Sequence, residues 1–519
     1  MSLHGLHLIA GQRRASGVGL FQGIDATTQA VLSPGFSEAS GAEIDAAVAA
    51  AVTAFAVFSD TTGEHRAAFL EAIATEIEAI GDPLLQRAHQ ETGLPLPRLT
   101  GERGRTCGQL RLFASVAREG SWVDARIDPA QPERKPLPRS DLRRMARPLG
   151  PIAVFGASNF PLAFSVAGGD TASALATGNP VVVKGHPAHP GTSELVGEAI
   201  VRAAATCKLP AGIFSLVQGR TPETSLALVR HPEVVAVTFT GSHTAGRALF
   251  DAAATRPQPI PVFAEMSSVN PLFILPGALR ESGAGIAEGL KNSFTLGVGQ
   301  FCTKPGLVFG VASPEWEAFV ETFVTRAKSV ARGTMLHAGI ASAFDRSLDS
   351  LTGVTWLERG GAAVARVTAA QLAGDPSLTH EKFGPFTLIV TASSLEEMTA
   401  LAGNLEGQLT ATIHAVGIDL SQAQPLIKQL ERIAGRLVIN GFPTGVEVSH
   451  AMHHGGPYPA TTDVRFTSVG SAALARFVRP VCYQDFPDSL RPDALKDANP
   501  LGLLRLVEGK PSRDPVRPP

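Results

Sequence analysis

Cysteine is scarce in this 519-residue chain, and its four cysteines stand far apart without a CxxC pair: Cys107, Cys207, Cys302 and Cys482. This scarcity excludes a disulfide framework and a thiolate zinc site, so a cysteine with a chemical role must act alone. An excess of basic residues is also missing, because 45 Lys and Arg stand against 47 Asp and Glu. Binding to nucleic acid is therefore not expected.

An uninterrupted hydrophobic run long enough to span a membrane is absent as well. The most apolar region, residues 151–169, contains Asn159, Pro161 and several Ser and Gly residues, which argues against a membrane span. The apolar stretch near the start is too short and interrupted for a signal peptide. The 44% of apolar residues is a normal core-forming share, and the length suggests about two to four domains. We expect a soluble, cytoplasmic protein.

Short apolar runs alternate with helical segments through the middle of the chain. Strands are expected at residues 152–155, 181–183, 213–217, 235–239 and 261–264. Continuous apolar strands separated by helices are typical of a parallel, doubly wound sheet covered on both faces. A second α/β series follows residue 266, with strands expected at 307–311, 387–390, 409–413 and 437–439.

Polar residues follow each of the first five strands. They are Asn159, Lys184, Arg220, Ser242 and Glu265. Ligands of doubly wound sheets bind outside the carboxyl ends of the strands, so together these residues predict a cofactor crevice. The turn that contains Gly241 and Ser242 opens a helix and suits a phosphate. It lacks the GxGxxG fingerprint, and taken alone it is an ordinary helix cap.

Cys302 differs from the other cysteines in its surroundings. Gly297 and Gly299 precede it, which suggests an exposed loop where a substrate can approach the backbone. A lone cysteine is more often a small buried apolar residue, and we interpret Cys107, Cys207 and Cys482 in that way. The sequence therefore offers Cys302 as its one candidate nucleophile.

Five motifs in order give the chain a resemblance to the aldehyde dehydrogenase superfamily, over residues 5–485. They are Asn159-Phe160-Pro161, Phe239-Thr240-Gly241-Ser242, Glu265 before Asn270-Pro271, Gly299-Gln300-Phe301-Cys302, and Glu381-Lys382-Phe383-Gly384-Pro385. The stretches at 155–170 and 184–193 resemble the α-ketoglutaric semialdehyde dehydrogenase branch. That branch oxidises 2,5-dioxopentanoate to 2-oxoglutarate.

The resemblance implies a fold and a division of the chain. The fold is an aldehyde-dehydrogenase-like α/β structure, in which a doubly wound cofactor domain joins a second α/β catalytic domain and a small oligomerisation arm. The implied parts are residues 1–123 and 149–264 for the cofactor domain, 265–467 for the catalytic domain, 124–148 and 468–485 for the arm, and 486–519 for a surface tail. It also implies a homodimer or homotetramer.

The resemblance further implies the catalytic roles. Cys302 would attack the aldehyde to give a thiohemiacetal, because a tetrahedral adduct is a better hydride donor than the aldehyde. The amide of Asn159 and the backbone N–H of Cys302 would stabilise its oxyanion. After hydride transfer leaves a thioester, Glu265 would serve as the general base for water.

The cofactor contacts follow from the same resemblance. Lys184 would bind the adenosine ribose, Glu381 the nicotinamide ribose, Phe383 the nicotinamide ring, and Ser242 with Gly241 the pyrophosphate. Many members that use NAD carry an acidic residue three positions after the lysine, where this chain has Pro187. The loss of that carboxylate removes repulsion of a 2′-phosphate, and Lys184 and Arg220 can attract it. NADP is therefore expected to be preferred, with NAD also possible.

The substrate side is less defined. Arg103, Arg105 and Arg111 lie on an expected helix that resembles one at the family's substrate entrance. An arginine there would bind a substrate carboxylate. Taken one at a time, each of the three is better interpreted as a solvated charge on the helix surface. Phe160, Phe164 and Phe442 would line the pocket of either a dicarbonyl acid or a fatty aldehyde.

Three alternatives remain open. They are an NADP-dependent medium- or long-chain fatty aldehyde dehydrogenase, a thiol esterase built on Cys302 and Glu265, and a non-catalytic member of the family. No metal is expected, because His186, His453 and His454 have no HExxH-type spacing. We interpret them as loop histidines near a surface or interface.

Overall fold

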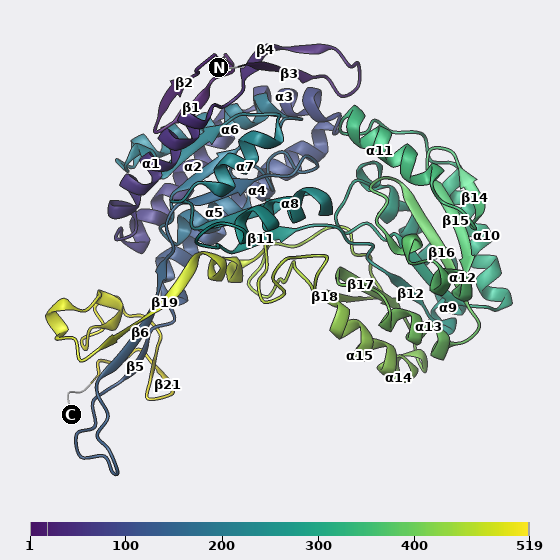
Figure 1. Cartoon of the computed structure of the whole chain (residues 1–519). Coiled ribbons are helices and arrows are strands. Elements are labelled where there is room, and N and C mark those ends of the chain that lie inside the picture. Colours follow the sequence, from purple (N-terminus) through teal and green to yellow (C-terminus); the bar gives the residue numbers. More distant parts are fainter. Residues whose placement is uncertain (1, 18, 517–519) are drawn as a thin grey trace.

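The computed structural model describes residues 2–17 and 19–516, and these form two α/β bodies and a projecting arm (Figure 1). The first body is built on a seven-stranded sheet of order β11-β10-β7-β8-β9-β1-β2. Its parallel strands are β7 (Ile152–Phe155), β8 (Val181–Lys184), β9 (Phe214–Val217), β10 (Ala236–Thr240) and β11 (Val262–Glu265). The antiparallel β1 (His7–Ile9) and β2 (Gln12–Arg14) complete one edge.

Helices cover both faces of this sheet. Ile152 and Val154 of β7 belong to one core, and Ala153 and Phe155 belong to another, as the alternation of a strand requires. The helices of this body are α1 (Gly41–Phe58), α2 (Gly63–Ile80), α3 (Asp82–Thr92), α4 (Leu96–Glu119), α5 (Gly169–Ala176), α6 (Pro190–Thr206), α7 (Pro222–Arg230) and α8 (His243–Ala254). The predicted α/β class with a doubly wound parallel sheet is confirmed.

Helix α1 has the length and hydropathy of a membrane-spanning segment, with a mean hydropathy of 1.6. It begins at a capping box in which Ser40 and Glu43 bond each other's backbone N–H groups. Its Ile44 and Val48 pack into the core beside β7, and a core helix of a layered domain passes the same length and hydropathy test.

The second body contains another seven-stranded sheet, of order β14-β15-β16-β13-β12-β17-β18. Its strands are β12 (Leu272–Ile274), β13 (Leu307–Val311), β14 (Thr355–Arg359), β15 (Ala363–Thr368), β16 (Phe386–Ala392), β17 (Gln408–His414) and β18 (Ala434–Ile439). Its helices are α9 (Pro276–Thr295), α10 (Pro314–Lys328), α11 (Ala338–Asp349), α12 (Ala369–Gly374), α13 (Leu395–Gly403), α14 (Asp419–Gln422) and α15 (Gln424–Ile433). All these strands are parallel to their neighbours except β14, which pairs antiparallel with β15.

The arm is a five-stranded sheet of order β19-β6-β5-β20-β21. Its strands are β5 (Arg126–Asp128), β6 (Leu142–Pro148), β19 (Val478–Gln484), β20 (Arg505–Val507) and β21 (Lys510–Ser512). A separate hairpin, β3 (Leu20–Ile24) with β4 (Val31–Ser37), lies on the first body near the N-terminus.

The C-terminal segment differs from the expected surface tail at 486–519. Strand β20 pairs with β5 of the arm, and Leu495 and Leu503 are buried in a small core with Ile127. These apolar residues are scattered among prolines and charges, so the sequence pattern concealed them. Residues 486–516 are thus part of the arm, and 517–519 lie outside the described residues.

Candidate active site

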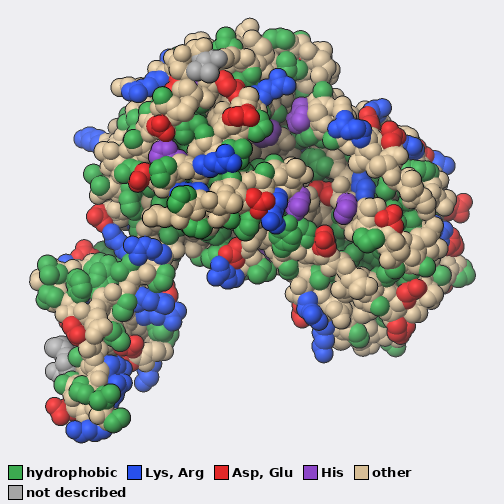
Figure 2. Space-filling view, in the orientation of Figure 1, with side chains coloured by type: hydrophobic (Ala, Val, Ile, Leu, Met, Phe, Trp, Pro, Cys, Tyr) green, Lys and Arg blue, Asp and Glu red, His purple; other side chains and the backbone are tan. Residues whose placement is uncertain are grey.

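A cavity of about 670 Å³ opens between the two bodies, and histidine side chains surround this hollow on the surface (Figure 2). It is lined from both bodies, by loops that follow β7, β10 and β11 and by residues of α11. Six residues expected at the site line it: Asn159, Gly241, Ser242, Cys302, Glu381 and Phe383. The edge predicted from the strand ends is therefore where the structure opens a ligand-sized space.

Cys302 is held at this cavity by an unusual turn. Gly297, Val298 and Gly299 before it all have positive φ values, between 57° and 66°. A Cβ atom on Gly299 would overlap the backbone of Gly384, so only glycine permits this close approach. From the other side the Asn270 amide donates hydrogen bonds to the carbonyl oxygens of Cys302 (2.8 Å) and Lys304 (3.0 Å). The thiol is thus presented from a clamped backbone.

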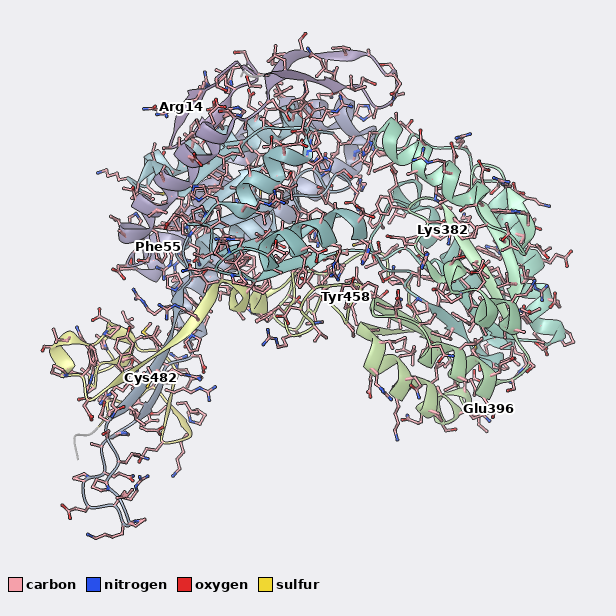
Figure 3. All side chains as sticks on the ribbon, viewed as in Figure 1. Arg14, Phe55, Lys382, Glu396, Tyr458 and Cys482 are labelled. Atoms are coloured by element: carbon pink, nitrogen blue, oxygen red, sulfur yellow. The ribbon has the colours of Figure 1, made fainter. Side chains whose placement is uncertain are left out.

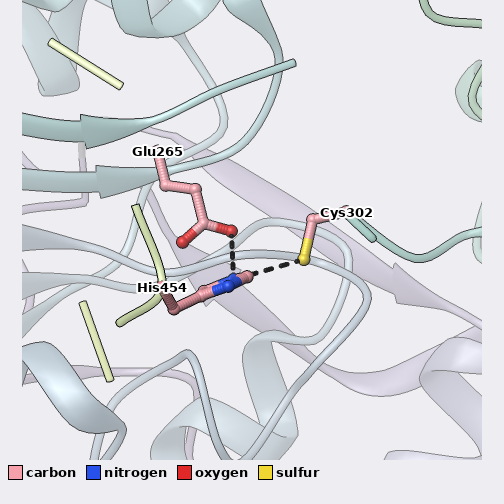
Figure 4. A group of neighbouring side chains, drawn as sticks. All are labelled: Glu265, Cys302 and His454. Carbon is pink, nitrogen blue, oxygen red and sulfur yellow. Dashed lines mark hydrogen bonds and ion pairs between the residues drawn. The ribbon is translucent and has the colours of Figure 1, made fainter. Parts of the chain in front are cut away.

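The thiol faces a histidine and a carboxylate (Figure 4). The Sγ atom of Cys302 lies 3.6 Å from Nε2 of His454, and the same Nε2 lies 3.0 Å from Oε1 of Glu265. The hydroxyl of Ser468 donates to the other carboxylate oxygen of Glu265 at 2.9 Å. His454 is only 1% exposed, so its interpretation as a surface loop histidine is wrong.

The surroundings shift the pKa values of Cys302 and Glu265 in opposite directions. Burial and the neighbouring Glu265 carboxylate raise the pKa of the Cys302 thiol well above its ordinary value. Burial also acts to raise the pKa of Glu265, but the charge of His454 and hydrogen bonds from His454, Ser468 and Cys302 outweigh it and lower that pKa. The resting site therefore contains a protonated thiol beside an ionised carboxylate.

His454 can accept the thiol proton because of where its ring nitrogen lies. Both contacts are made by Nε2, so that one atom meets Cys302 and Glu265 together. In the tautomer that carries its proton on Nδ1, Nε2 is free to take the thiol proton, and the resulting imidazolium then donates a hydrogen bond to the Glu265 carboxylate, which stabilises it. A histidine placed in this way fits the activation of a thiol nucleophile.

Asn159 follows β7 and points its amide into the same region. One N–H of its Nδ2 donates to the carbonyl of Gln300 at 2.9 Å, which leaves the second N–H for another acceptor. The Arg98 guanidinium donates a hydrogen bond to the backbone carbonyl oxygen of Asn159 at 2.8 Å. The Glu102 carboxylate accepts the backbone N–H groups of Leu162 and Ala163 just beyond it. Residues of α4 therefore fix the loop that carries the amide.

The cofactor side of the cavity is formed around the start of α8. Ser242 is the N-cap of this helix, and its hydroxyl accepts the Ala245 N–H at 3.3 Å. A Cβ atom at Gly241 would overlap the Phe239 ring, so this turn requires glycine, and Gly241 and Ser242 line the cavity. Backbone N–H groups at a helix start suit a pyrophosphate, as the sequence predicts.

Glu381, Lys184 and Arg220, which were also predicted to bind the cofactor, differ in burial. Burial raises the pKa of Glu381 to about 7, against the opposing charge of Lys304. Burial lowers the pKa of Lys184, at the end of β8, to about 8. Arg220 is exposed after β9, its backbone N–H bonds Glu38, and it is absent from the described cavity lining.

Beyond the thiol, aromatic rings and two arginines form a second cluster. The ring of Phe160 lies 5.4 Å from that of Phe164 and 5.2 Å from that of Phe301. The Arg105 guanidinium lies 5.0 Å from the Phe164 ring centroid, and Arg98 lies 4.9 Å from that of Phe160. Phe164 also lies 6.3 Å from the His454 ring, so this cluster borders the thiol.

Arg105 has unused hydrogen-bonding capacity. Its Nε and Nη2 atoms are buried without a hydrogen-bond partner among the described residues. Burial lowers its pKa, whereas Glu102, Cys302 and Glu265 oppose that shift, which places its charge within electrostatic reach of the reactive group. A guanidinium stays protonated even so, and its free donors suit an incoming carboxylate.

The structure does not bring the other predicted substrate residues to this cluster. Arg111 forms a two-pronged ion pair with Glu78 on the exposed side of α4, at 2.7 and 2.8 Å. Arg103 donates to the Gly81 carbonyl. Phe442 packs against His414 at 5.1 Å and beside α9. Helical spacing explains why only one of the three predicted arginines lies in this cluster. Arg105 is seven residues from Arg98 and shares its face of α4, whereas Arg103 and Arg111 face α2.

His454 and Arg98 are the residues that the sequence missed. Arg98, Glu102 and Arg105 recur at helical spacing, and that pattern could have singled them out. His454 has no such signal, because it lies in an irregular segment 152 residues from Cys302.

Comparisons with known proteins agree with this geometry. The model of the aldehyde dehydrogenase family matches residues 16–342. An α-ketoglutaric semialdehyde dehydrogenase 2 from Azospirillum brasilense is 51% identical over 98% of this chain and 100% of its own length. An α-ketoglutaric semialdehyde dehydrogenase from Acinetobacter baylyi is 48% identical over 98% of both chains.

Solved structures share the fold at lower identity. Betaine aldehyde dehydrogenase from Staphylococcus aureus in complex with NAD+ has a TM-score of 0.80 at 20% identity, covering 93% of this chain and 96% of its own. A 3,6-anhydro-L-galactose dehydrogenase has a TM-score of 0.79 at 21% identity, covering 92% and 99%.

Proposed function

The chain belongs to the aldehyde dehydrogenase family, and from that premise we propose that it oxidises α-ketoglutaric semialdehyde (2,5-dioxopentanoate) to 2-oxoglutarate, with NADP preferred. Enzymes of this family convert aldehydes to carboxylic acids. One observation carries the proposal: a thiol, a histidine and a carboxylate meet beside a buried arginine with free donors. The near-full-length similarity to two α-ketoglutaric semialdehyde dehydrogenases supports the same substrate.

The reaction begins at Cys302. As Sγ bonds to the aldehyde carbon, the thiol proton passes to Nε2 of a His454 ring whose own proton is on Nδ1, and Glu265 stabilises the imidazolium. The aldehyde oxygen becomes an oxyanion, for which the free N–H of Asn159 and the backbone N–H of Cys302 serve as donors. The product of this step is a thiohemiacetal on Cys302.

A bound nicotinamide cofactor would supply the hydride acceptor, and loss of hydride from the substrate carbon leaves a thioester on Cys302. Glu265 then removes a proton from a water molecule that attacks the thioester carbon. Its lowered pKa keeps it in the basic form that this step needs. The carbon–sulfur bond breaks, 2-oxoglutarate leaves, and the sulfur regains its proton.

The cavity fits a dinucleotide. Gly241 and Ser242 present a helix start for the pyrophosphate, and Glu381 offers a carboxylate for ribose hydroxyls. Lys184 lies at the end of β8, and Pro187 stands where a carboxylate would repel a 2′-phosphate. These features support a preference for NADP. A comparison of kcat/KM for the two cofactors tests it, and a clear advantage for NAD would overturn it.

The substrate assignment rests on Arg105. A carboxylate on the substrate would give its buried donors their missing partner, which a neutral aldehyde cannot do. A fatty aldehyde dehydrogenase is the second candidate, because the rings of Phe160, Phe164 and Phe301 offer an apolar surface. Steady-state kinetics with dioxopentanoate, glutarate semialdehyde and alkanals separate the two. A large margin in favour of alkanals would reject the proposed substrate.

We also propose a homo-oligomer in the cytoplasm. Strand β18 leaves one edge of the second sheet open, with Leu437 40% and Ile439 55% exposed, and the projecting arm offers strands to pair with such an edge. All four cysteines lie in the described residues as free thiols, which suits a reducing compartment. Light scattering during size-exclusion chromatography tests the assembly, and a monomeric mass would contradict it.

A further inference from the structure

The reactive group of Cys302, His454 and Glu265 has a second chemical capacity besides the oxidation of an aldehyde. The ligand atoms of these three residues lie within 4.8 Å of one another (Figure 4). We propose that they form a binding site for one zinc ion, and that bound zinc reversibly blocks the enzyme. This proposal does not depend on which aldehyde the enzyme oxidises.

The donor set is one that zinc prefers. Thiolate sulfur, imidazole nitrogen and carboxylate oxygen are all common zinc ligands, whereas Mg²⁺ and Ca²⁺ favour oxygen ligands. Bonds of about 2.0–2.3 Å in a tetrahedral site place ligand atoms roughly 3.3–3.8 Å apart. The observed separations are 3.6 Å between Sγ and Nε2 and 3.0 Å between Nε2 and Oε1. These two pairs need shifts of only a few tenths of an ångström, and the sulfur and the Glu265 oxygen lie within 4.8 Å of each other.

Charge also favours the ion at this buried position. A thiolate and a carboxylate together neutralise Zn²⁺, while a neutral imidazole adds no charge. The balanced step is the loss of the Cys302 thiol proton to solvent as the zinc–sulfur bond forms. If Nε2 of His454 holds its proton, this moves to Nδ1, which is buried and has no hydrogen-bond partner among the described residues.

The surroundings complete an open, exchangeable site. Ser468 donates to the Glu265 oxygen that faces away from His454, and such a hydrogen bond orients a ligating carboxylate. Cys302 lines the cavity, so a water molecule can occupy the fourth position and the ion can enter and leave. Arg105 and Arg436 lie within electrostatic reach of the sulfur, and their charge weakens zinc binding.

Zinc held in this way removes both functional groups of the reaction. The sulfur lone pair is shared with the metal, and the Glu265 carboxylate is no longer free to accept a proton from water. Inhibition should therefore be competitive with the aldehyde and reversed by a chelator.

The test measures metal binding without substrate or cofactor, so it stands apart from the proposed function. The full-length enzyme is titrated with Zn²⁺ by calorimetry and with Co²⁺ by absorbance, since a cobalt–thiolate bond gives a charge-transfer band. We expect one ion per chain, with affinity at least tenfold weaker in His454→Ala and in Cys302→Ser. His453→Ala is the matched control, since this half-buried neighbour lies outside the group and should leave affinity unchanged.

Circular dichroism checks that each variant is folded, and two independent variants keep the test decisive if one is not. The proposal is overturned if the wild-type enzyme binds no ion, or if a folded His454→Ala or Cys302→Ser variant binds as tightly as the wild type. A cobalt spectrum without the thiolate band would overturn it as well.

Discussion

Two buried regions of the molecule each contain a cysteine, and only one of them is equipped for chemistry. Cys107 lies in the middle of α4, fully buried, with its thiol directed at the Ala74 carbonyl 3.6 Å away. Burial raises its pKa to about 11, and burial likewise raises the pKa of Cys302. Both thiols are therefore protonated at rest. Cys302 differs by a base in contact and a cavity in front of it.

The comparison teaches that a raised pKa does not by itself decide the reactivity of a thiol. A buried thiol without a base keeps its proton and acts as a small apolar side chain. The interpretation of Cys482 as a buried apolar residue is wrong, because it lies exposed on the arm (Figure 3), and Cys207, the C-cap of α6, is only half-buried.

Replacement of Cys302 and of Cys107 should give opposite results. We expect Cys302→Ser to lower kcat by a factor on the order of 10⁴ or more, because a serine hydroxyl at this position is a far weaker nucleophile. Cys107→Ala should retain near-normal activity and lose only some stability to the small cavity. Initial rates of NADPH formation measure the first effect and thermal unfolding the second. Loss of activity in Cys107→Ala alone would contradict the assignment.

Replacement of the base should stop the second half of the reaction. In Glu265→Gln the amide can still accept a hydrogen bond but cannot take a proton from water, so kcat should fall by about 10²–10⁴. The first half should survive and appear as a burst of one NADPH per active site. Rapid-mixing absorbance detects the burst. A variant that turns over at the wild-type rate would show that another group activates the water.

Removal of His454 should leave the Cys302 thiol without a proton acceptor, as the Cys107 thiol is. We expect His454→Ala to lower kcat/KM at neutral pH by about 100-fold, since the thiol loses its proton acceptor. Because the thiol pKa is raised, thiolate increases with pH, and the rising limb of the pH profile should move to higher pH in the variant.

His453→Ala is the control for that experiment, because this residue is adjacent in sequence but outside the reactive group. A pH profile of His454→Ala that coincides with the wild type would limit the histidine to a structural role.

The smallest expected effect concerns two arginines of α4, one near each cysteine. Arg105→Leu should lower kcat/KM for dioxopentanoate by about 10- to 100-fold, the cost of a lost charge-assisted contact of about 1.5–3 kcal/mol. Its kcat/KM for hexanal should change little. Arg111→Leu, near Cys107, should leave both substrates unaffected because its exposed partner is Glu78. Equal losses of kcat/KM with both aldehydes in Arg105→Leu would show that Arg105 does not bind the substrate carboxylate.

The sequence predicted what depends on local pattern. The five parallel strands of the first sheet were located nearly to the residue, because each is a short apolar run followed by a turn. Three strands of the second sheet were missed: β12, which has only three residues, β14, which is half exposed, and β15 beside it. The residues 486–516 were misread as a tail because their few apolar side chains lack periodicity.

In the site, too, residues within local motifs were predicted, whereas contacts between distant parts of the chain were not. Cys302, Glu265 and Asn159 stand in recognisable motifs, so they were named from the sequence. The His454 contact joins parts of the chain that are 152 and 189 residues apart, and no spacing rule connects them. The choice among Arg103, Arg105 and Arg111 needed the rotation of α4 against its neighbours, which tertiary packing sets.

The most direct test of the account is mass spectrometry of Glu265→Gln after mixing with 2,5-dioxopentanoate and NADP. With deacylation blocked, the account predicts a 2-oxoglutaryl group in thioester linkage on the peptide that contains Cys302, together with one equivalent of NADPH. An unmodified Cys302 peptide despite NADPH formation, or the acyl group on Cys107, would contradict it.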